Sequence, residues 1–342
     1  MGFDDKKIKV TRFRIDGWTD EDTRSAAEKI KTHLALPLDQ ILGEEPNIGW
    51  ADGKAELNLD LGNCMVGENI FVSMRIAARK IPAGIKKALY RKKAEEYKKA
   101  TKSDYISRKE KLRIEEEVRE TLLPRTMPTV KSAWVIITPD GMAYLGSVGN
   151  REKGLFTELF AKTFKKELHE RTIFDIVPSE QCNAVSPAGY ADLEFLTDLF
   201  RQTEDDDSDS DFAVSAPFDL VSTDDTSLCT RALAAGDAVS LSPEVRAALK
   251  QNKLFKKLRM SVGNFAGYGK YDRFEFTLTR DLGMSGLQTP EGEEQEFAAR
   301  FAEKLGMVRD IFDWIDREVA DFVKRATRPD FADKKRAWIA GR

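Results

Sequence analysis

The stretch that decides the fold is "NIFVSMRIAARKIPAGIKKALYRKKAEEYKKATK", residues 69–102, because a strand pattern changes there into a basic helical pattern. Residues 69–78 are rich in β-branched and aromatic side chains, which predicts a strand. From Pro82 to Thr101 the apolar side chains become sparse and lysine dominates, which predicts a helix with a narrow apolar face. The sequence thus predicts a strand that leads directly into a strongly basic helix.

A second helix and a hairpin follow this basic helix. The second helix is expected to start near Ser103-Asp104, a good N-terminal cap, and to end at Leu123 before Pro124. The run "SAWVIITPDGMAYLGSV", residues 132–148, predicts a β-hairpin because Pro139-Asp140-Gly141 supplies turn residues between two apolar runs. Further strands are expected at 7–15 and 55–61, and helices at 19–35 and 153–171. The fold class is therefore α+β, an antiparallel sheet layer with helices.

A long amphipathic helix is predicted near the C-terminus, with Thr289 as its cap and Pro290 at its first position. Its stripe of apolar side chains recurs at spacings of three and four and comprises Phe297, Phe301, Leu305, Val308, Phe312, Ile315, Val319 and Phe322. Such a face must pack on something. We expect it to pack on the basic helix pair, on a second copy of the chain, or on both. The predicted dimer-interface residues are Phe301, Phe312 and Ile315.

These elements suggest three parts. A centre domain comprises residues 1–77 and 118–178, and a helical base comprises residues 78–117 and 289–328. Residues 179–288 form a smaller α+β tip domain, with a helix expected at 242–252. Within it, the acidic stretch 203–212 predicts a disordered or exposed loop. The glycine-rich run 263–270 has neither of the common nucleotide-binding orders and predicts a hairpin loop.

Positive charge is concentrated in the basic helix pair. The chain has 342 residues with 55 basic and 58 acidic side chains, yet residues 75–113 contain fifteen basic and only four acidic ones. A solvated helical face is the plain alternative, but such a face usually interleaves acids at i,i+4. Repulsion on this scale favours a polyanion as partner, and Lys and Arg without nearby Asn or Gln suit phosphates more than base edges. The predicted DNA-binding residues are Arg79, Lys80, Lys86, Lys87, Arg91, Lys92, Lys93, Lys98, Lys99 and Arg125.

The remaining composition gives no positive sign of catalysis. No apolar run is long enough to span a membrane. The three cysteines, Cys64, Cys182 and Cys229, are far apart, and two histidines are too few for most metal centres, so we expect reduced thiols in a cytosol, no metal and no cofactor. No nucleophile motif accompanies His33 or His169. Paired carboxylates for metal-assisted nuclease chemistry stay open as an alternative, because 58 acids allow many pairs.

The order of elements resembles the RdgC family of bacterial recombination-associated proteins. The resemblance rests on "IFVSMRIAARKIPAGIKKALYRKKAEEYKK", "RKEKLRIEEEVRETLLPR", the "AWVII…GMAYLGS" hairpin, "IGW" at 48–50, "EFLTDLFRQTE" at 194–204 and "EFAARFAEKLGMVRDIFDWI". It implies a ring-shaped homodimer whose basic inner surface encircles double-stranded DNA without sequence preference. It also implies competition with the recombinase RecA, no known chemistry, and a nucleoid-associated location in the cytoplasm.

The resemblance carries over to particular residues of this chain. Lys80, Pro82, Lys86, Lys87 and the "LLPR" of residues 122–125 match the family pattern. Two positions depart from it. Met127 stands where the family tends to have an exposed aromatic side chain linked to DNA binding, and an acidic stretch around Asp224 and Asp225 replaces a basic pair.

Two alternatives from other classes stay open beside DNA binding. The basic helix pair could dock an acidic protein partner, or the chain's own acidic half. Alternatively the protein could be a metal-dependent DNA-processing enzyme. Binding to a duplex through several phosphates would weaken linearly on a log–log plot against salt, which distinguishes it from docking of a protein partner. Metal-dependent cleavage of DNA would favour the enzyme.

Overall fold

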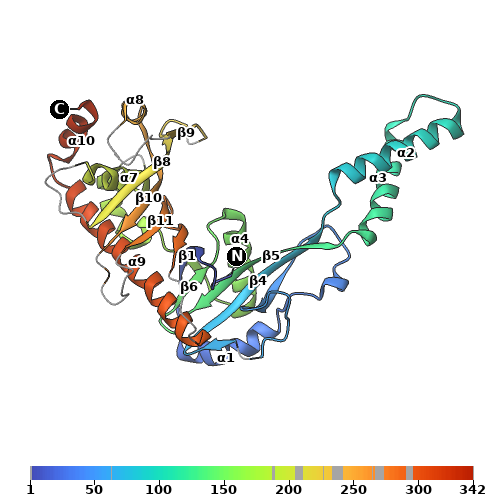
Figure 1. The fold of residues 1–342 in the computed structure, drawn as a ribbon, viewed down its shortest axis with the longest axis horizontal. Coiled ribbons are helices and arrows are strands. Elements are labelled where there is room, and N and C mark those ends of the chain that lie inside the picture. The colour runs from blue at the N-terminus through green and yellow to red at the C-terminus, as the bar shows by residue number, and fades with distance from the viewer. Residues whose placement is uncertain are drawn as a thin grey trace.

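The computed structural model of the chain describes residues 2–62, 64–186, 189–204, 211–225, 227–232, 242–263, 265, 273–289 and 296–341. Its architecture confirms the α+β class, with antiparallel strands and helices packed on them. The molecule bends into an arch (Figure 1): a central part lies at the bottom, a C-terminal lobe rises on one side, and a helical hairpin projects on the other.

One run of hydrogen-bonded strands passes through the centre and the C-terminal lobe in the order β2-β4-β5-β6-β1-β12-β11-β10-β8-β9. The central strands are β1 (Lys7–Ile15), β2 (Asn47–Asp52), β3 (Met65–Val66), β4 (Asn69–Arg79), β5 (Pro128–Ile137), β6 (Met142–Leu145) and β7 (Leu168–Glu170). The strands of the lobe are β8 (Phe212–Ser222), β9 (Cys229–Ala232), β10 (Lys253–Val262), β11 (Phe274–Thr279) and β12 (Met284–Gln288).

Strand β1 joins the centre to the lobe. Its first residues pair with β12, with Lys7 opposite Gln288, and its later residues pair with β6, with Thr11 opposite Leu145. The expected tip, residues 179–288, is therefore continuous with the central sheet. The same continuity appears in the core, where one cluster of buried side chains contains Phe71 of the centre and Phe218 of the lobe.

The helices cover this sheet unequally. Helices α1 (Asp20–Lys31) and α4 (Asn150–Phe164) cover one face of the central strands, with Phe13 and Val72 in the core between them. On the other face lies α9 (Phe297–Ala326), which continues along the lobe beside α7 (Ala191–Gln202). The other helices are η1 (Leu38–Gln40), α2 (Ala83–Thr101), α3 (Arg108–Leu122), η2 (Leu123–Arg125), α5 (Ile173–Ile176), α6 (Ser179–Val185), α8 (Pro243–Lys250) and α10 (Phe331–Ala340).

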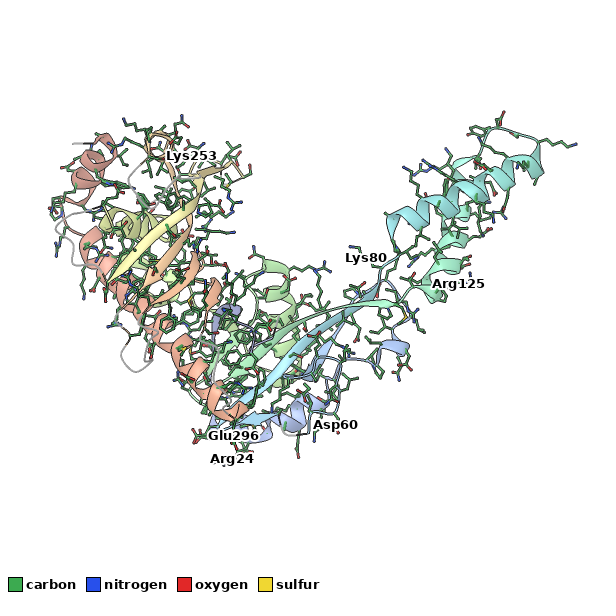
Figure 2. The ribbon with its side chains drawn as sticks, in the orientation of Figure 1. Arg24, Asp60, Lys80, Arg125, Lys253 and Glu296 are labelled. Atoms are coloured by element: carbon green, nitrogen blue, oxygen red, sulfur yellow. The ribbon has the colours of Figure 1, made fainter. Side chains whose placement is uncertain are left out.

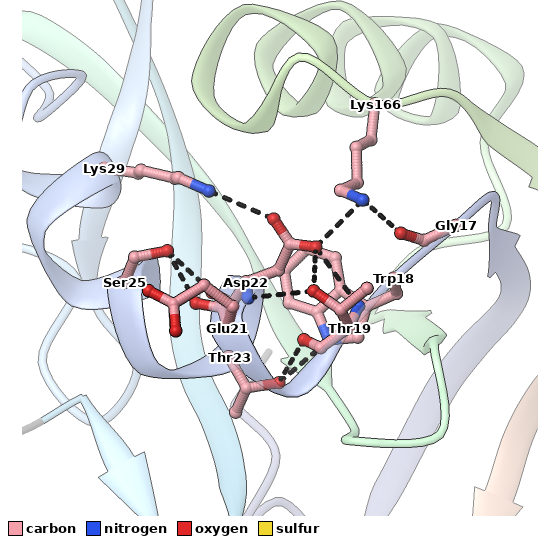
Figure 3. Close-up of polar contacts among 9 residues, drawn as sticks. All are labelled: Gly17, Trp18, Thr19, Glu21, Asp22, Thr23, Ser25, Lys29 and Lys166. Atoms are coloured by element: carbon pink, nitrogen blue, oxygen red, sulfur yellow. Dashed lines mark hydrogen bonds and ion pairs between the residues drawn. The ribbon is translucent and has the colours of Figure 1, made fainter.

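Helix α1 shows how the sequence fixes a helix start (Figure 3). Thr19, the first residue of the helix predicted at 19–35, accepts a hydrogen bond from the backbone N–H of Asp22, and the Asp22 carboxylate accepts one from the backbone N–H of Thr19. The same carboxylate lies 2.8 Å from Lys166 Nζ and 3.1 Å from Lys29 Nζ. Burial raises the pKa of Asp22, but the hydrogen bonds from Lys166, Thr19 and Lys29 outweigh it and hold the pKa well below its usual range.

The packing of α9 corrects the expectation for the C-terminal stripe. Neither the basic hairpin nor a second copy is needed to cover it, because the chain's own sheet and α7 do so. The ring of Phe301 lies 5.2 Å from that of Phe3, and the ring of Phe322 lies 5.6 Å from that of Phe195. Phe301, Phe312 and Ile315, the expected dimer-interface residues, are 1%, 1% and 0% exposed within one chain. The stripe therefore supplies no argument for a dimer.

The expected helical base is also different in the structure. Helices α2 and α3 project away from the body and bury their own small cluster around Ile106, Ile114 and Val118, while α9 packs in the core of the body (Figure 1). The sheet explains this arrangement. Strands β4 and β5 pair along ten residue positions, from Ile70 opposite Ile137 to Arg79 opposite Pro128, and so carry the hairpin outward as an extension of the sheet.

Four sequence predictions of local structure were wrong at their ends or in type, and the first is the helix expected at 19–35, which ends at Lys31. Residues 55–61 form a loop rather than a strand, because the side chains of Asp52, Asn58 and Asp60 accept hydrogen bonds from nearby backbone N–H groups and stabilise turns. Helix α3 starts after Ser107, whose hydroxyl accepts from Glu110 N, rather than at Ser103-Asp104. The helix expected to reach 171 ends at Phe164, and the strand β7 follows it.

Some expectations fall outside the residues that the structure describes. These are most of the acidic stretch 203–212, most of the glycine-rich run 263–270, and Pro290 as the first residue of the long helix, which begins at Phe297 in the described part.

Candidate nucleic-acid interface

The projecting hairpin of α2 and α3 has little apolar surface to bury. Leu89 and Tyr97 of α2 pack on Ile114 and Val118 of α3. No residue of α2 is fully buried. Most of the helix surface therefore remains in contact with solvent, and the lysines that fill it keep their charges accessible.

Most of the predicted DNA-binding cations on α2 have no acidic partner in the described part of the chain. This holds for Lys86, Lys87, Arg91, Lys92, Lys98 and Lys99, while elsewhere on the surface many lysines and arginines pair with a carboxylate within 4 Å. Lys86 and Lys87 also line a small groove between α2 and α3, beside Tyr90 and Glu115. Unpaired cations along a solvated helix are the arrangement that a polyanion neutralises best.

Lys93 differs from its neighbours on α2. Its Nζ lies 2.9 Å from Glu117 Oε2 on α3, and this hydrogen bond lowers the pKa of Glu117. The pair holds the two helices together and neutralises both charges. Of the predicted DNA-binding lysines on α2, Lys93 is therefore the one that the structure places in an internal ion pair.

The cations of α2 fall on more than one face. At 3.6 residues per turn, the spacings of four and seven residues place Lys87, Arg91 and Lys98 along one stripe. Lys92 and Lys99 lie on another face of the helix, close to Glu95 and Glu96 in the sequence. The stripe of Lys87, Arg91 and Lys98 extends over about 16 Å, or about five base-pair steps of a duplex.

Three of the predicted DNA-binding cations lie at the root of the hairpin: Arg79, Lys80 and Arg125. The Arg79 guanidinium donates hydrogen bonds to the carbonyl oxygens of Ile41, Leu123, Pro124 and Thr126, so the structure uses this side chain to hold the hairpin in place. Lys80 lies at the concave side of the root and Arg125 at the opposite side (Figure 2), and both are exposed.

The lobe adds a polar surface that the sequence analysis did not single out. Helices cover one face of its strands, and on the other face a row of exposed and half-buried side chains crosses five strands. In register, this row consists of Lys9, Ser285, Thr277, Arg259 and Ser215. Arg259 pairs with Glu275 at 3.1 Å. The signal in the sequence is the alternation of "KLRMSV", residues 257–262, in which Lys257, Arg259 and Ser261 share one face.

Among the described residues, no three His, Cys, Asp or Glu side chains gather as a metal site would need. None of the helices in the described part combines the length and the apolar character of a membrane span.

A family model described as "Putative exonuclease, RdgC" matches residues 9–181, just over half of the chain. The match includes the central strands and the whole basic hairpin. No curated protein matches the chain. A row of cations without acidic partners on α2 is the kind of electrostatic feature that nucleic-acid-binding proteins carry. The chain belongs to the RdgC family, and it is in this general sense a recombination-associated DNA-binding protein.

Proposed function

We propose that the protein binds double-stranded DNA without sequence preference and without chemistry, and that it limits the access of a recombinase such as RecA to DNA. The observation that carries the proposal is the set of unpaired cations on the projecting hairpin. Lys and Arg of this kind contact phosphates, which are the same for every sequence. The proposal places the protein on the nucleoid in the cytoplasm.

A second copy of the chain completes the proposed binding mode. One chain is an arch that is open between the hairpin and the lobe (Figure 1), and two arches joined end to end would enclose a duplex. Homodimerisation through the buried stripe of α9 has lost its support, so the contacts of such a ring fall on the exposed surfaces of the two arms. Light scattering on the free protein tests this part, and a mass of one chain at micromolar concentration would contradict it.

Charge reversal on the hairpin tests DNA binding. We expect the variant Lys86→Glu, Lys87→Glu, Arg91→Glu and Lys92→Glu to remain folded, because none of these side chains is buried. Its binding to a duplex should be abolished at about 0.15 M salt. Two duplexes of unrelated sequence serve as the matched comparison. Unchanged affinity, or a loss confined to one sequence, would overturn the proposal.

A nuclease is the competing function, and the description of the matching family model is what favours it. Incubation of a labelled duplex with the protein and Mg²⁺ or Mn²⁺ separates the two. We expect intact DNA at protein concentrations that saturate binding. Shortened strands that disappear when the metal is chelated would replace the binding proposal by an enzymatic one.

A further inference from the structure

A pocket of about 430 Å³ lies at the root of the hairpin, on the face of the central sheet that α1 and α4 cover. Helix α4 begins at Asn150, but strands β4 and β5 continue past this point toward the hairpin. The uncovered stretch of sheet forms the floor, with Ile76 and Ala78 on β4. The first turn of α4 forms one wall, and the segment around Glu44 and Pro46 forms another.

The pocket is lined by Arg79, whose guanidinium is engaged by backbone carbonyl oxygens, and by three further cations. Lys80 and Lys131 come from the ends of β4 and β5, and Arg151 comes from the first turn of α4. All three are exposed, and none pairs with a carboxylate in the described part of the chain. Register explains the grouping. Lys131 stands opposite Ile76, and Lys80 follows two residues after Ala78, so both point to the same face as the apolar floor.

The carboxylates of the pocket do not cancel these charges. Glu44 is engaged by Arg119, whose Nε lies 3.1 Å from Glu44 Oε2. Glu152 is then the remaining carboxylate of the lining, and it balances only one of the three charges of Lys80, Lys131 and Arg151. The start of α4 adds to the same field, because its cap residue, Gly149, offers no side chain to accept from the first N–H groups. The pocket is therefore electropositive with an apolar floor.

From this combination we infer that the pocket binds a nucleotide, with its phosphate among Lys80, Lys131 and Arg151 and its base against Ile76, Ala78 and Pro46. The volume lies within the range of small-ligand sites. A walled pocket admits a group that protrudes, such as a free nucleotide or the phosphorylated end of a strand, whereas the backbone inside a duplex runs past it. Binding of a phosphorylated strand end rests on the proposed DNA-binding function, whereas binding of a free nucleotide does not.

Calorimetric titration of the full chain with dAMP, deoxyadenosine and inorganic phosphate tests the nucleotide. We expect dAMP to bind at least about tenfold more tightly than either of the others, because each supplies only half of the contacts. The double variant Lys131→Gln and Arg151→Gln should weaken dAMP by a similar factor. The variant Lys162→Gln and Lys165→Gln, at the other end of α4, should not. Equal affinity for dAMP and phosphate, or no effect of the pocket variant, would overturn the inference.

Three DNA substrates then assign the source of the nucleotide. A linear duplex with 5′ phosphates should outcompete its dephosphorylated form, and the pocket variant should lose this preference. The affinity of the pocket variant for a closed circular duplex should stay unchanged, because the hairpin is intact. Absence of an end preference with retained dAMP binding would assign the pocket to a free nucleotide. The charge-reversed hairpin variant tests the proposed function separately. If this variant loses binding to the closed circle, the result bears on DNA binding by the hairpin and not on the pocket.

Discussion

Arg79 Nη1 lies 2.9 Å from the carbonyl oxygen of Thr126, and this hydrogen bond joins the last residue of β4 to the segment just before β5. The same guanidinium reaches Ile41, Leu123 and Pro124. The Arg79 side chain thus ties the turn of η2, which ends the hairpin, to the end of β4 and to the segment at Ile41. The orientation of the cationic hairpin relative to the sheet therefore depends in part on these contacts.

Arg79→Lys is expected to loosen the hairpin without unfolding the body. A lysine keeps the charge but cannot present several donors in a fixed plane, and the loss should be about 2 kcal/mol of local stability. Hydrogen exchange should quicken by roughly tenfold or more over residues 83–125 and stay unchanged in β10 and β11. Protection that falls equally in both regions would show that Arg79 supports the whole fold instead.

Phe312→Ala is expected to destabilise the chain by about 3–5 kcal/mol, because the ring is 1% exposed and packs on Tyr144 at 6.0 Å. Urea unfolding at two protein concentrations tenfold apart measures this. If α9 is covered within one chain, the loss is the same at both concentrations and the mass of the folded protein does not change. A loss that shrinks at the higher concentration would return Phe312 to an interface between copies.

Lys304 gives a stability that depends on pH. Burial lowers the pKa of its ammonium to about 8, against the opposing charges of Asp4 and Asp5. Above this pKa the folded state binds fewer protons at Lys304 than the unfolded state, so folding stability rises with pH until the unfolded lysine also titrates. Relative to Lys304→Met, the wild type should gain about 2 kcal/mol between pH 7 and pH 9.5. A constant difference across this range would contradict the buried ammonium.

The sequence was informative where local pattern and tertiary structure agree. Strand β1 has the predicted bounds, 7–15, and the helix pair between β4 and β5 was recognised from its sparse apolar residues and its flanking strands. The predicted start of the next helix at residue 19 is also close to the observed one, because the Thr19 hydroxyl satisfies a free N–H group at the helix start. The family resemblance also rests on this region, and the family match covers it.

The packing of α9 could not be read from its sequence. A stripe such as Phe301 to Phe322 indicates that the helix must be covered, but not by which element, since a sheet, a helix pair or a second copy can each offer an apolar face. The ion pairs of the hairpin could not be read from the sequence either. Lys92 and Lys93 are adjacent and chemically identical in the sequence, yet only Lys93 reaches Glu117, because the position of α3 decides it. Arg79 was assigned to DNA for the same reason.

The salt dependence of duplex binding tests the central claim most directly. The variant Lys87→Gln, Arg91→Gln and Lys98→Gln removes the stripe on α2, and Lys324→Gln, Arg328→Gln and Lys334→Gln removes the same charge near the far end of the molecule. On a plot of log affinity against log salt, the first variant should have a slope smaller in magnitude by about 2.7 for each chain on the DNA, about 0.9 for each phosphate contact. The second variant should keep the slope of the wild type. Equal slopes for all three proteins would contradict a phosphate-binding hairpin.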